Sequence, residues 1–424
     1  MIASIGRNIK NYGDHLAAFR PNARLYLIYA IITGIAMGIF RLLFNFYILS
    51  LGYDEKVLGN LVTASSITAL IFALPMGYLA DLLGRKSSLL ISATIISTCV
   101  GLMVIWPTTA VLYAMNILSG IAQSLAGVTM SPFLMENSSE HERTYLFSMT
   151  SGLQMVSASV GSWIGGYLPT WVAGRLNVEA VSSQAYAGSL LVVAIALAVG
   201  IVPLLLIKIP HVAHAEKTVF APISFAAKNP KKLTKLILPM LLTSIGAGLI
   251  MPFMNVFFRV QYNQSDQVIG VLFAWGSLAM GLGILAAPPL ADRFGKIQVV
   301  VITQALSIPF LILLGFAPIF WISAVAYYIR VALMNMSGPV YQTFVMEQVD
   351  SSSRAMVASL VSMSWNFGWA ISPTISGMLQ VRYGFGPPFL GTIILYTVSV
   401  FLYWFFWLRK SEQKETAPPL VVAE

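Results

Sequence analysis

The chain has little charge and almost no cysteine. Asp, Glu, Lys and Arg make up only 10% of its 424 residues, whereas 57% are hydrophobic and the mean hydropathy is +0.79. Soluble domains carry about 25% charged residues, so this chain has too few to cover a water-exposed surface of its size. One cysteine, Cys99, excludes a disulfide framework and a cysteine-based metal site. The composition predicts an integral membrane protein.

Acidic and histidine side chains are missing from the middle of the apolar runs. All 16 Asp and Glu residues and all 4 His residues lie in tails, loops or the ends of runs. The runs therefore lack the paired acids that a membrane-bound transferase needs for a metal–diphosphate site, and they place no protonatable group at mid-membrane. His211 and His214 lack a supporting carboxylate or cysteine, which makes a metal site there a weak hypothesis. We expect no enzyme activity, no cofactor and no resident metal.

Twelve apolar runs approach the 20 or so residues that a spanning helix needs. They cover residues 25–51, 57–80, 87–106, 110–135, 144–168 and 186–207 in the first half, and 236–259, 268–291, 298–316, 319–346, 355–379 and 388–408 in the second. We therefore expect an N-terminal segment (1–24), a six-helix bundle (25–207), a linker (208–235), a second six-helix bundle (236–408) and a tail (409–424). The first 21 residues have no sustained apolar core, so they are not expected to be a secretory signal.

Basic residues predict the orientation. Of the 25 Lys and Arg residues, 19 lie in the two tails, the linker and every second loop. Because basic residues favour the cytoplasmic side, we expect a multi-pass protein of the cell membrane with both termini in the cytoplasm. The net charge of +9 then reflects topology, and nucleic acid is not an expected partner.

The two halves repeat each other at an offset of 211 residues. The polar hinge Gly77–Leu89 returns at Pro288–Lys296, with Asp81 matched by Asp292 (292 − 81 = 211). Met135-Glu136 likewise matches Met346-Glu347. Since six spans preserve orientation, the halves are parallel repeats, a plan that places solute sites at the repeat interface near mid-membrane.

The hinge and its repeat resemble the loop signature of the major facilitator superfamily, Gly-x-x-x-Asp-(Arg/Lys)-x-Gly-(Arg/Lys)-(Arg/Lys), over essentially the whole chain. Leu82 departs from the basic residue expected after the Asp, whereas Arg293 keeps it. The resemblance implies an all-α fold of 12 transmembrane helices around a central cavity and rocker-switch alternating access. It also implies a cytoplasmic latch that bridges the halves; the alternative is that these charges only fix the topology. The expected latch residues are Asp81, Gly84, Arg85, Glu136, Arg143, Asp292, Gly295, Lys296, Glu347 and Arg354.

Two arginines lie inside spans, where charge is rare and usually functional. In the resembled fold the first, fourth, seventh and tenth helices line the cavity, so Arg41 and Arg330 could face each other. Snorkelling or a structural bond to backbone carbonyls is the alternative for each, and the two asparagines could simply brace helix packing. The candidate solute-binding residues are Arg41, Asn45, Gln123, Asn255, Arg330, Ser337 and Tyr341. Because Arg pairs with carboxylate and phosphate oxygens, we expect a small, anionic organic solute.

Other functions stay open at this stage. A multidrug or amphiphile exporter of the same fold would bind its cargo mainly through aromatic residues and methionines, of which the chain has 24 Phe and 19 Met. A non-transporting substrate sensor is a more distant alternative, because the tail Ser411–Glu424 is short for signalling. We expect a monomer in the lipid bilayer. The sequence leaves the direction of transport and any coupling ion open.

Overall fold

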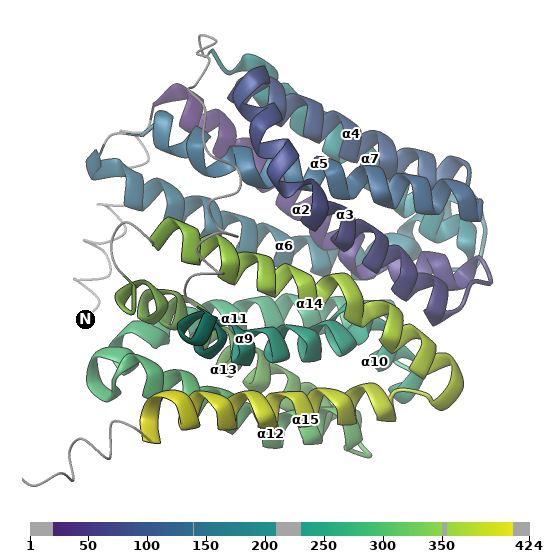
Figure 1. The fold of residues 1–424 in the computed structure, drawn as a ribbon. Helices are drawn as coiled ribbons and strands as arrows, with labels where there is room; N and C mark the ends of the chain where they lie inside the picture. Colours follow the sequence, from purple (N-terminus) through teal and green to yellow (C-terminus); the bar gives the residue numbers. More distant parts are fainter. Residues whose placement is uncertain (1–19, 139, 209–229, 350–353, 410–424) are drawn as a thin grey trace, which may run out of the picture. The chain divides into compact units, whose positions relative to one another are not determined.

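The computed structural model describes residues 20–138, 140–208, 230–349 and 354–409, and at a few helical positions it describes the backbone alone. Within these ranges every regular element is helical (Figure 1). Most of the expected N-terminal segment, linker and tail lie outside them, and so do His211 and His214. The twelve expected spans all appear as helical rods.

The rods follow the expected runs closely. The first six are α2 (Pro21–Ser50), α3 (Glu55–Leu83), α4 (Arg85–Ile105), α5 (Thr109–Glu136), α6 (Glu140–Leu176) and α7 (Ser183–Leu206). The next six are α9 (Pro230–Ile250) continued by α10 (Met254–Tyr262), α11 (Asp266–Phe294), α12 (Lys296–Phe316), α13 (Phe320–Glu347), α14 (Arg354–Tyr383) and α15 (Gly386–Tyr403), which a short π-helix extends to Leu408. In the described part, nine rods are long and apolar enough to cross a membrane. The other three, α6, α13 and α14, are as long but more polar.

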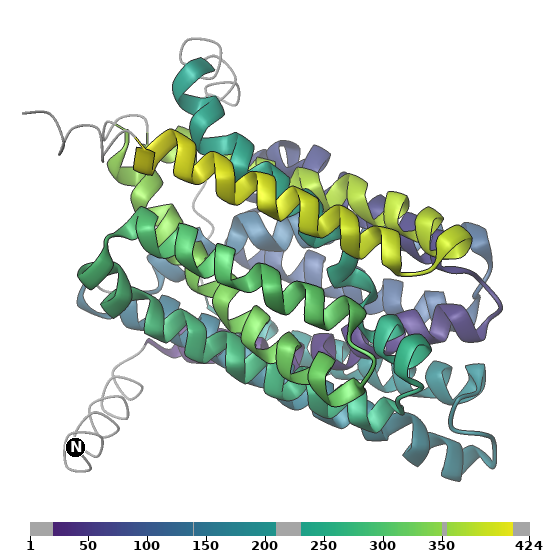
Figure 2. The same ribbon diagram turned by 90° about the horizontal axis from the view of Figure 1, so that it is seen from below.

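The chain forms two compact units. The first comprises residues 1–54, 64–217 and 259–278, and the second comprises residues 55–63, 218–258 and 279–424. The beginning of α3 thus belongs with the second unit, and α11 begins in the first. Within the second unit, for example, α12 and α15 lie side by side (Figures 1 and 2).

Helix packing within each unit confirms the internal repeat. In the first unit α2 packs on α6 and α7, and α4 packs on α5 and α7. In the second unit α9 packs on α14 and α15, and α12 packs on α13 and α15. Counting the rods in order, each pair of the second set lies six rods after a pair of the first. The two sequence halves therefore adopt the same internal arrangement.

Glycines bring helix backbones into contact in the first unit. Gly34 and Gly38 form one ridge on α2, and Gly161 and Gly165 form another on α6, each pair four residues apart. A Cβ on Gly38 would overlap the carbonyl of Ala158, and a Cβ on Gly161 would overlap the carbonyl of Ile35. Small residues at this spacing allow close helix association in lipid. The glycine-rich stretch of the fifth span is thus a packing surface.

The seventh rod is broken, contrary to the expectation of one continuous helix over residues 236–259. A 3₁₀ turn, Met251–Phe253, separates α9 from α10. Pro252 explains the break, because proline has no N–H for the α-helical ladder and its ring clashes with the preceding turn. The proline was visible in the sequence, but hydropathy alone does not reveal the break.

Candidate functional site

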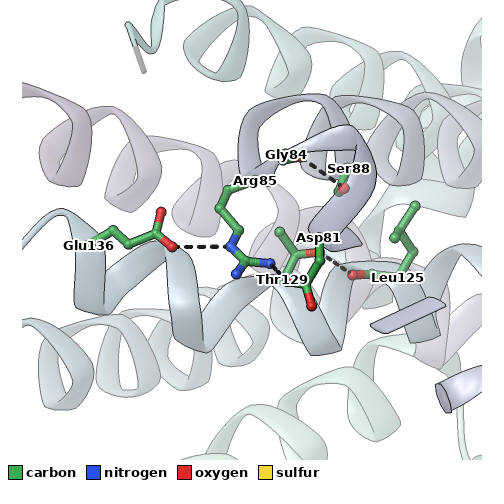
Figure 3. Close-up of polar contacts among 7 residues, drawn as sticks. All are labelled: Asp81, Gly84, Arg85, Ser88, Leu125, Thr129 and Glu136. Carbon is green, nitrogen blue, oxygen red and sulfur yellow. Dashed lines mark hydrogen bonds and ion pairs between the residues drawn. The ribbon is translucent and has the colours of Figure 1, made fainter. Parts of the chain in front are cut away.

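A cluster of three charged residues lies at the hinge between α3 and α4. Arg85, in the first turn of α4, lies between two carboxylates (Figure 3). Its Nη1 is 2.7 Å from Asp81 Oδ1 and its Nε is 3.2 Å from Glu136 Oε1 at the end of α5. Only 9% of the Arg85 side chain is exposed, so the guanidinium is held by both acids rather than by water. The cluster joins α3, α4 and α5 at one end of the first unit.

The turn that places Arg85 depends on glycine. Gly84 caps α4 with φ 79° and ψ 159°, a conformation that is essentially confined to glycine. Its carbonyl accepts hydrogen bonds from the Ser88 N–H at 3.1 Å and the Ser88 hydroxyl at 2.9 Å. Gly295 caps α12 in the same way, with φ 89° and ψ 149°.

The second unit holds the repeat of this cluster in reduced form. Lys296 forms an ion pair with Glu347, and these residues are 51 positions apart, as are Arg85 and Glu136. The Lys296 and Glu347 side chains are 33% and 52% exposed, so this pair is weaker than its counterpart. Residues near each pair in the sequence belong to buried apolar clusters: Leu89, Phe133 and Leu134 in the first unit, and Val299, Val300 and Val345 in the second.

The other expected latch residues stay predictions. Asp292, the counterpart of Asp81, is exposed. Arg143 and Arg354 lie in the first turns of α6 and α14, and their side chains are outside the described part. The structure thus shows two charge pairs at repeated positions, whereas a latching role for them remains a prediction.

A cavity of about 430 Å³ lies within the second unit. This is large enough for a small organic molecule. Its wall comes from α9, α12, α13, α14 and the end of α15, and no charged residue is among those that line it. The lining residues are Met240, Thr243, Gln304, Met334, Asn335, Ser337, Gly338, Tyr341, Gln342, Val345, Met346, Ala358, Val361, Ser362, Trp365 and Tyr403.

Helix periodicity explains why these residues meet. On α14 the lining positions are 358, 361, 362 and 365, which is one face of a helix. On α13 the lining positions are 334, 335, 337, 338, 341, 342, 345 and 346, which cover a broader face of that helix. Tyr341 is anchored there, because its hydroxyl donates to the Leu236 carbonyl of α9. The cavity is therefore bounded by rods that the fold holds in register.

Ser337 and Tyr341 were expected at a solute site, and both line this cavity. Arg330 does not. Its side chain is fully buried one turn before Met334, and its Nη2 donates to the Tyr396 hydroxyl at 3.2 Å. Its Nε and Nη1 have no hydrogen-bond partner among the described residues. The binding roles of these residues remain predictions.

The remaining candidates lie on other rods. In the first unit, Arg41 on α2 is exposed, whereas Asn45, one turn later, is 5% exposed. Gln123 on α5 is exposed. Asn255, in the second unit, is 2% exposed, and its Oδ1 accepts from the Val256 N–H at 3.0 Å. Both asparagines are thus buried, and their roles stay predictions.

One charge cluster was missed by the sequence analysis. In the first unit, Asp266 at the start of α11 forms an ion pair with Arg259 of α10 and accepts a hydrogen bond of 2.8 Å from the hydroxyl of Tyr186 on α7. Arg259 also donates to that hydroxyl at 2.9 Å, and its guanidinium carbon lies 3.3 Å from the centre of the Phe46 ring. Asp266 is the one buried carboxylate among the described side chains. Its place at a helix end made it look like a loop residue.

A duplicated set of six membrane-spanning rods, a charged hinge at each repeat and a solute-sized cavity define the class: the chain is a polytopic membrane transporter. The family model described as Major Facilitator Superfamily matches residues 26–244 and 236–421. The chain belongs to this superfamily.

The related sequences have low identity to this chain, but the matches extend over most of its length. The chain is 24% identical over 399 residues to multidrug resistance protein MdtG of Dickeya zeae, a match that spans 90% of this chain and 93% of that protein. It is 23% identical over 372 residues to quinolone resistance protein NorA of Staphylococcus aureus, spanning 84% of this chain and 90% of that one.

Solved structures share the fold. A bacterial homologue of the lysosomal transporter Spinster, in an inward-facing and occupied conformation, gives a TM-score of 0.76 at 12% identity and covers 94% of this chain and 98% of its own. The nucleoside transporter NupG gives 0.73 at 17% identity, covering 91% and 98%. At these identities the likeness shows the fold alone.

Proposed function

We propose that this transporter carries a small, uncharged or amphiphilic organic solute across the membrane by alternating access, with the second unit's cavity as its binding site. The observation that carries the proposal is the cavity wall, which contains no charged residue among those described. An anion there would lose its hydration without gaining a counter-charge, which costs several kcal/mol. The sequence favoured an anionic solute, and the cavity shifts that preference.

The cavity surface suits a lipophilic body. Three methionines, Met240, Met334 and Met346, line the cavity together with Trp365 and Tyr403. Methionine adapts its shape to varied ligands, and aromatic faces provide large apolar contact areas. The names of two relatives, a multidrug and a quinolone resistance protein, support the same class of cargo.

An anionic solute is the second candidate, and Arg330 supports it. A guanidinium that is fully buried with two unpartnered nitrogens calls for a negative group, because arginine stays charged in proteins. Arg41, exposed on α2, is a further cationic group inside a span. In either case the distribution of basic residues supports cytoplasmic termini.

A binding experiment tests the cavity. A Cβ on Gly338 would meet no atom within 4 Å, so Gly338→Leu fills the cavity without a backbone clash. Gly174 on α6 is equally open, is exposed and lies outside the cavity, which makes Gly174→Leu the matched control. We expect Gly338→Leu to weaken binding of an uncharged aromatic probe at least tenfold and Gly174→Leu to leave it unchanged. Equal affinity in both variants would refute the proposed site.

A second comparison separates the two candidates. Thermal stabilisation of the purified protein is measured with an aromatic amide and with the corresponding carboxylate, in wild type and Arg330→Met. The proposal expects the amide to stabilise wild type and Arg330→Met alike. Stabilisation by the carboxylate alone, lost in Arg330→Met but kept in the exposed control Arg382→Met, would establish the anionic solute instead.

A further inference from the structure

The wall of the cavity carries two amide side chains, one buried and one half-buried, whose orientation is fixed by the protein. Gln304, on α12, is 6% exposed, and its Nε2 donates to the Ser337 hydroxyl oxygen at 3.3 Å. Asn335, on α13, donates from Nδ2 to the Val331 carbonyl at 2.8 Å. Both residues line the cavity.

The identity of the donating atoms follows from their partners. The Val331 carbonyl is an acceptor only, so the Asn335 atom beside it must be nitrogen. The Ser337 hydroxyl donates its proton to the Met334 carbonyl at 2.8 Å, so it accepts from Gln304. The assignment of oxygen and nitrogen in each amide is therefore determined by hydrogen bonding rather than by choice.

The two amide oxygens are available to accept hydrogen bonds from a solute. Gln304 Oε1 and Asn335 Oδ1 have no hydrogen-bond partner among the described residues, whereas each amide nitrogen already donates once. A carbonyl oxygen carries two lone pairs, so the two amides offer four acceptor positions and retain one N–H each. The Ser337 hydroxyl already donates to the Met334 carbonyl and accepts from Gln304. The Tyr341 hydroxyl already donates its proton to the Leu236 carbonyl. At these two amides the four acceptor positions thus outnumber the two remaining N–H donors.

We infer that Gln304 and Asn335 select solutes that present N–H or O–H donors, such as lactams, amides and amines, over isosteric solutes that carry acceptors only. The inference rests on the proposed function and specifies its solute class. A solute without donors would desolvate two amide oxygens and leave them unpaired, which is the costly side of hydrogen bonding. Because each amide nitrogen already donates one hydrogen bond within the protein, the side chain cannot turn its oxygen away without breaking that bond, and each amide keeps a single N–H for an acceptor on the solute.

The test uses a matched pair of probes. Quinolin-2(1H)-one carries a lactam N–H, and its N-methyl derivative replaces that donor with a methyl group on the same ring. Dissociation constants are measured by equilibrium dialysis against the full-length protein in detergent. We expect the N–H compound to bind about three- to tenfold more tightly, the range for one hydrogen bond between neutral groups.

Substitutions locate the effect. Gln304→Leu and Asn335→Leu keep approximate volume and remove the acceptor, so the ratio of the two dissociation constants should fall toward one. Gln304→Glu keeps an acceptor and should retain the preference for N–H, which separates recognition from folding damage. Gln261→Leu, an exposed amide on α10, is the control and should keep the wild-type ratio.

The outcomes distinguish the inference from the proposed function. Equal binding of both probes to wild type, with both lost in Gly338→Leu, overturns the inference and leaves the cavity as the binding site. A preference for N–H that survives in Gln304→Leu and Asn335→Leu also overturns it. Absence of saturable binding by either probe overturns the inference as well, whereas flux of other uncharged solutes would still support the proposed function.

Discussion

Gly84→Ala is the sharpest test of the hinge geometry. Gly84 adopts φ 79° and ψ 159° immediately before Arg85, and an alanine forced into this region costs about 1–3 kcal/mol. The cost falls on the turn that presents Arg85 to Asp81 and Glu136. Relaxing the turn to an ordinary conformation would move the guanidinium away from both acids, so neither route avoids a loss of stability.

Gly77→Ala is the matched control, because Gly77 lies seven residues earlier in the interior of α3 and an added Cβ would meet no atom within 4 Å. Replacing glycine by alanine inside a helix stabilises it by about 0.5–1 kcal/mol. The assay is thermal unfolding of the detergent-solubilised protein, in which each kcal/mol of stability shifts the Tm by about 2–4 °C for a domain of 150–250 residues. Gly84→Ala should therefore lower the Tm by about 2–12 °C. Gly77→Ala should leave the Tm unchanged or raise it. Equal Tm values for the two variants would refute the argument.

Three further predictions, which use five substitutions, test packing and charge in the same assay. Arg85→Gln should destabilise the protein by about 1–2 kcal/mol because two acids lose a largely buried partner. Lys296→Gln should cost less than about 1 kcal/mol because its ion pair is exposed. A larger effect of Lys296→Gln than of Arg85→Gln would contradict this order. Gly38→Ala should cost about 1–3 kcal/mol of stability because the added Cβ overlaps the α6 backbone. Gly101→Ala is the control and should be tolerated, because its Cβ would lie 3.9 Å from the nearest atom. Equal Tm values for the two variants would count against the backbone contact. Tyr186→Phe should cost about 1–3 kcal/mol because Asp266 and Arg259 each lose a buried partner, and a wild-type Tm would show that the hydroxyl contributes nothing.

The sequence predicted the hinge well because the chemistry of the hinge is local. Asp81, Gly84 and Arg85 lie within five positions, and a glycine between charged residues at the end of an apolar run indicates a turn at a membrane surface. The partner Glu136 came from the repeat, since the offset of 211 pairs it with Glu347. Local spacing plus an internal copy was enough to select the residues of two ion pairs that the structure contains, although their expected role as a latch stays a prediction.

The cavity was harder to predict because its wall depends on how rods pack. Ser337 and Tyr341 were found because they continue the face of Arg330 on one helix. Gln304 lies on α12, and nothing in the sequence says which face of that helix meets α13. Asp266 was overlooked for a related reason: a carboxylate at a helix end reads as solvated, and only the neighbouring α7 makes it buried.

The contact between the α2 and α6 backbones has a mechanical consequence. Where Gly38 lies against the Ala158 carbonyl and Gly161 against the Ile35 carbonyl, no side chain lies between the two backbones to change rotamer and absorb a displacement. The two rods of such a pair slide or tilt only by separating along their whole seam. Gly368 of α14, where an added Cβ would overlap the backbone of Ser244 and Ile245 on α9, gives the second unit a contact of the same kind. Each unit therefore has a stiff spine of two rods, and compliance is left to the segments outside these seams, such as the 3₁₀ turn at Pro252.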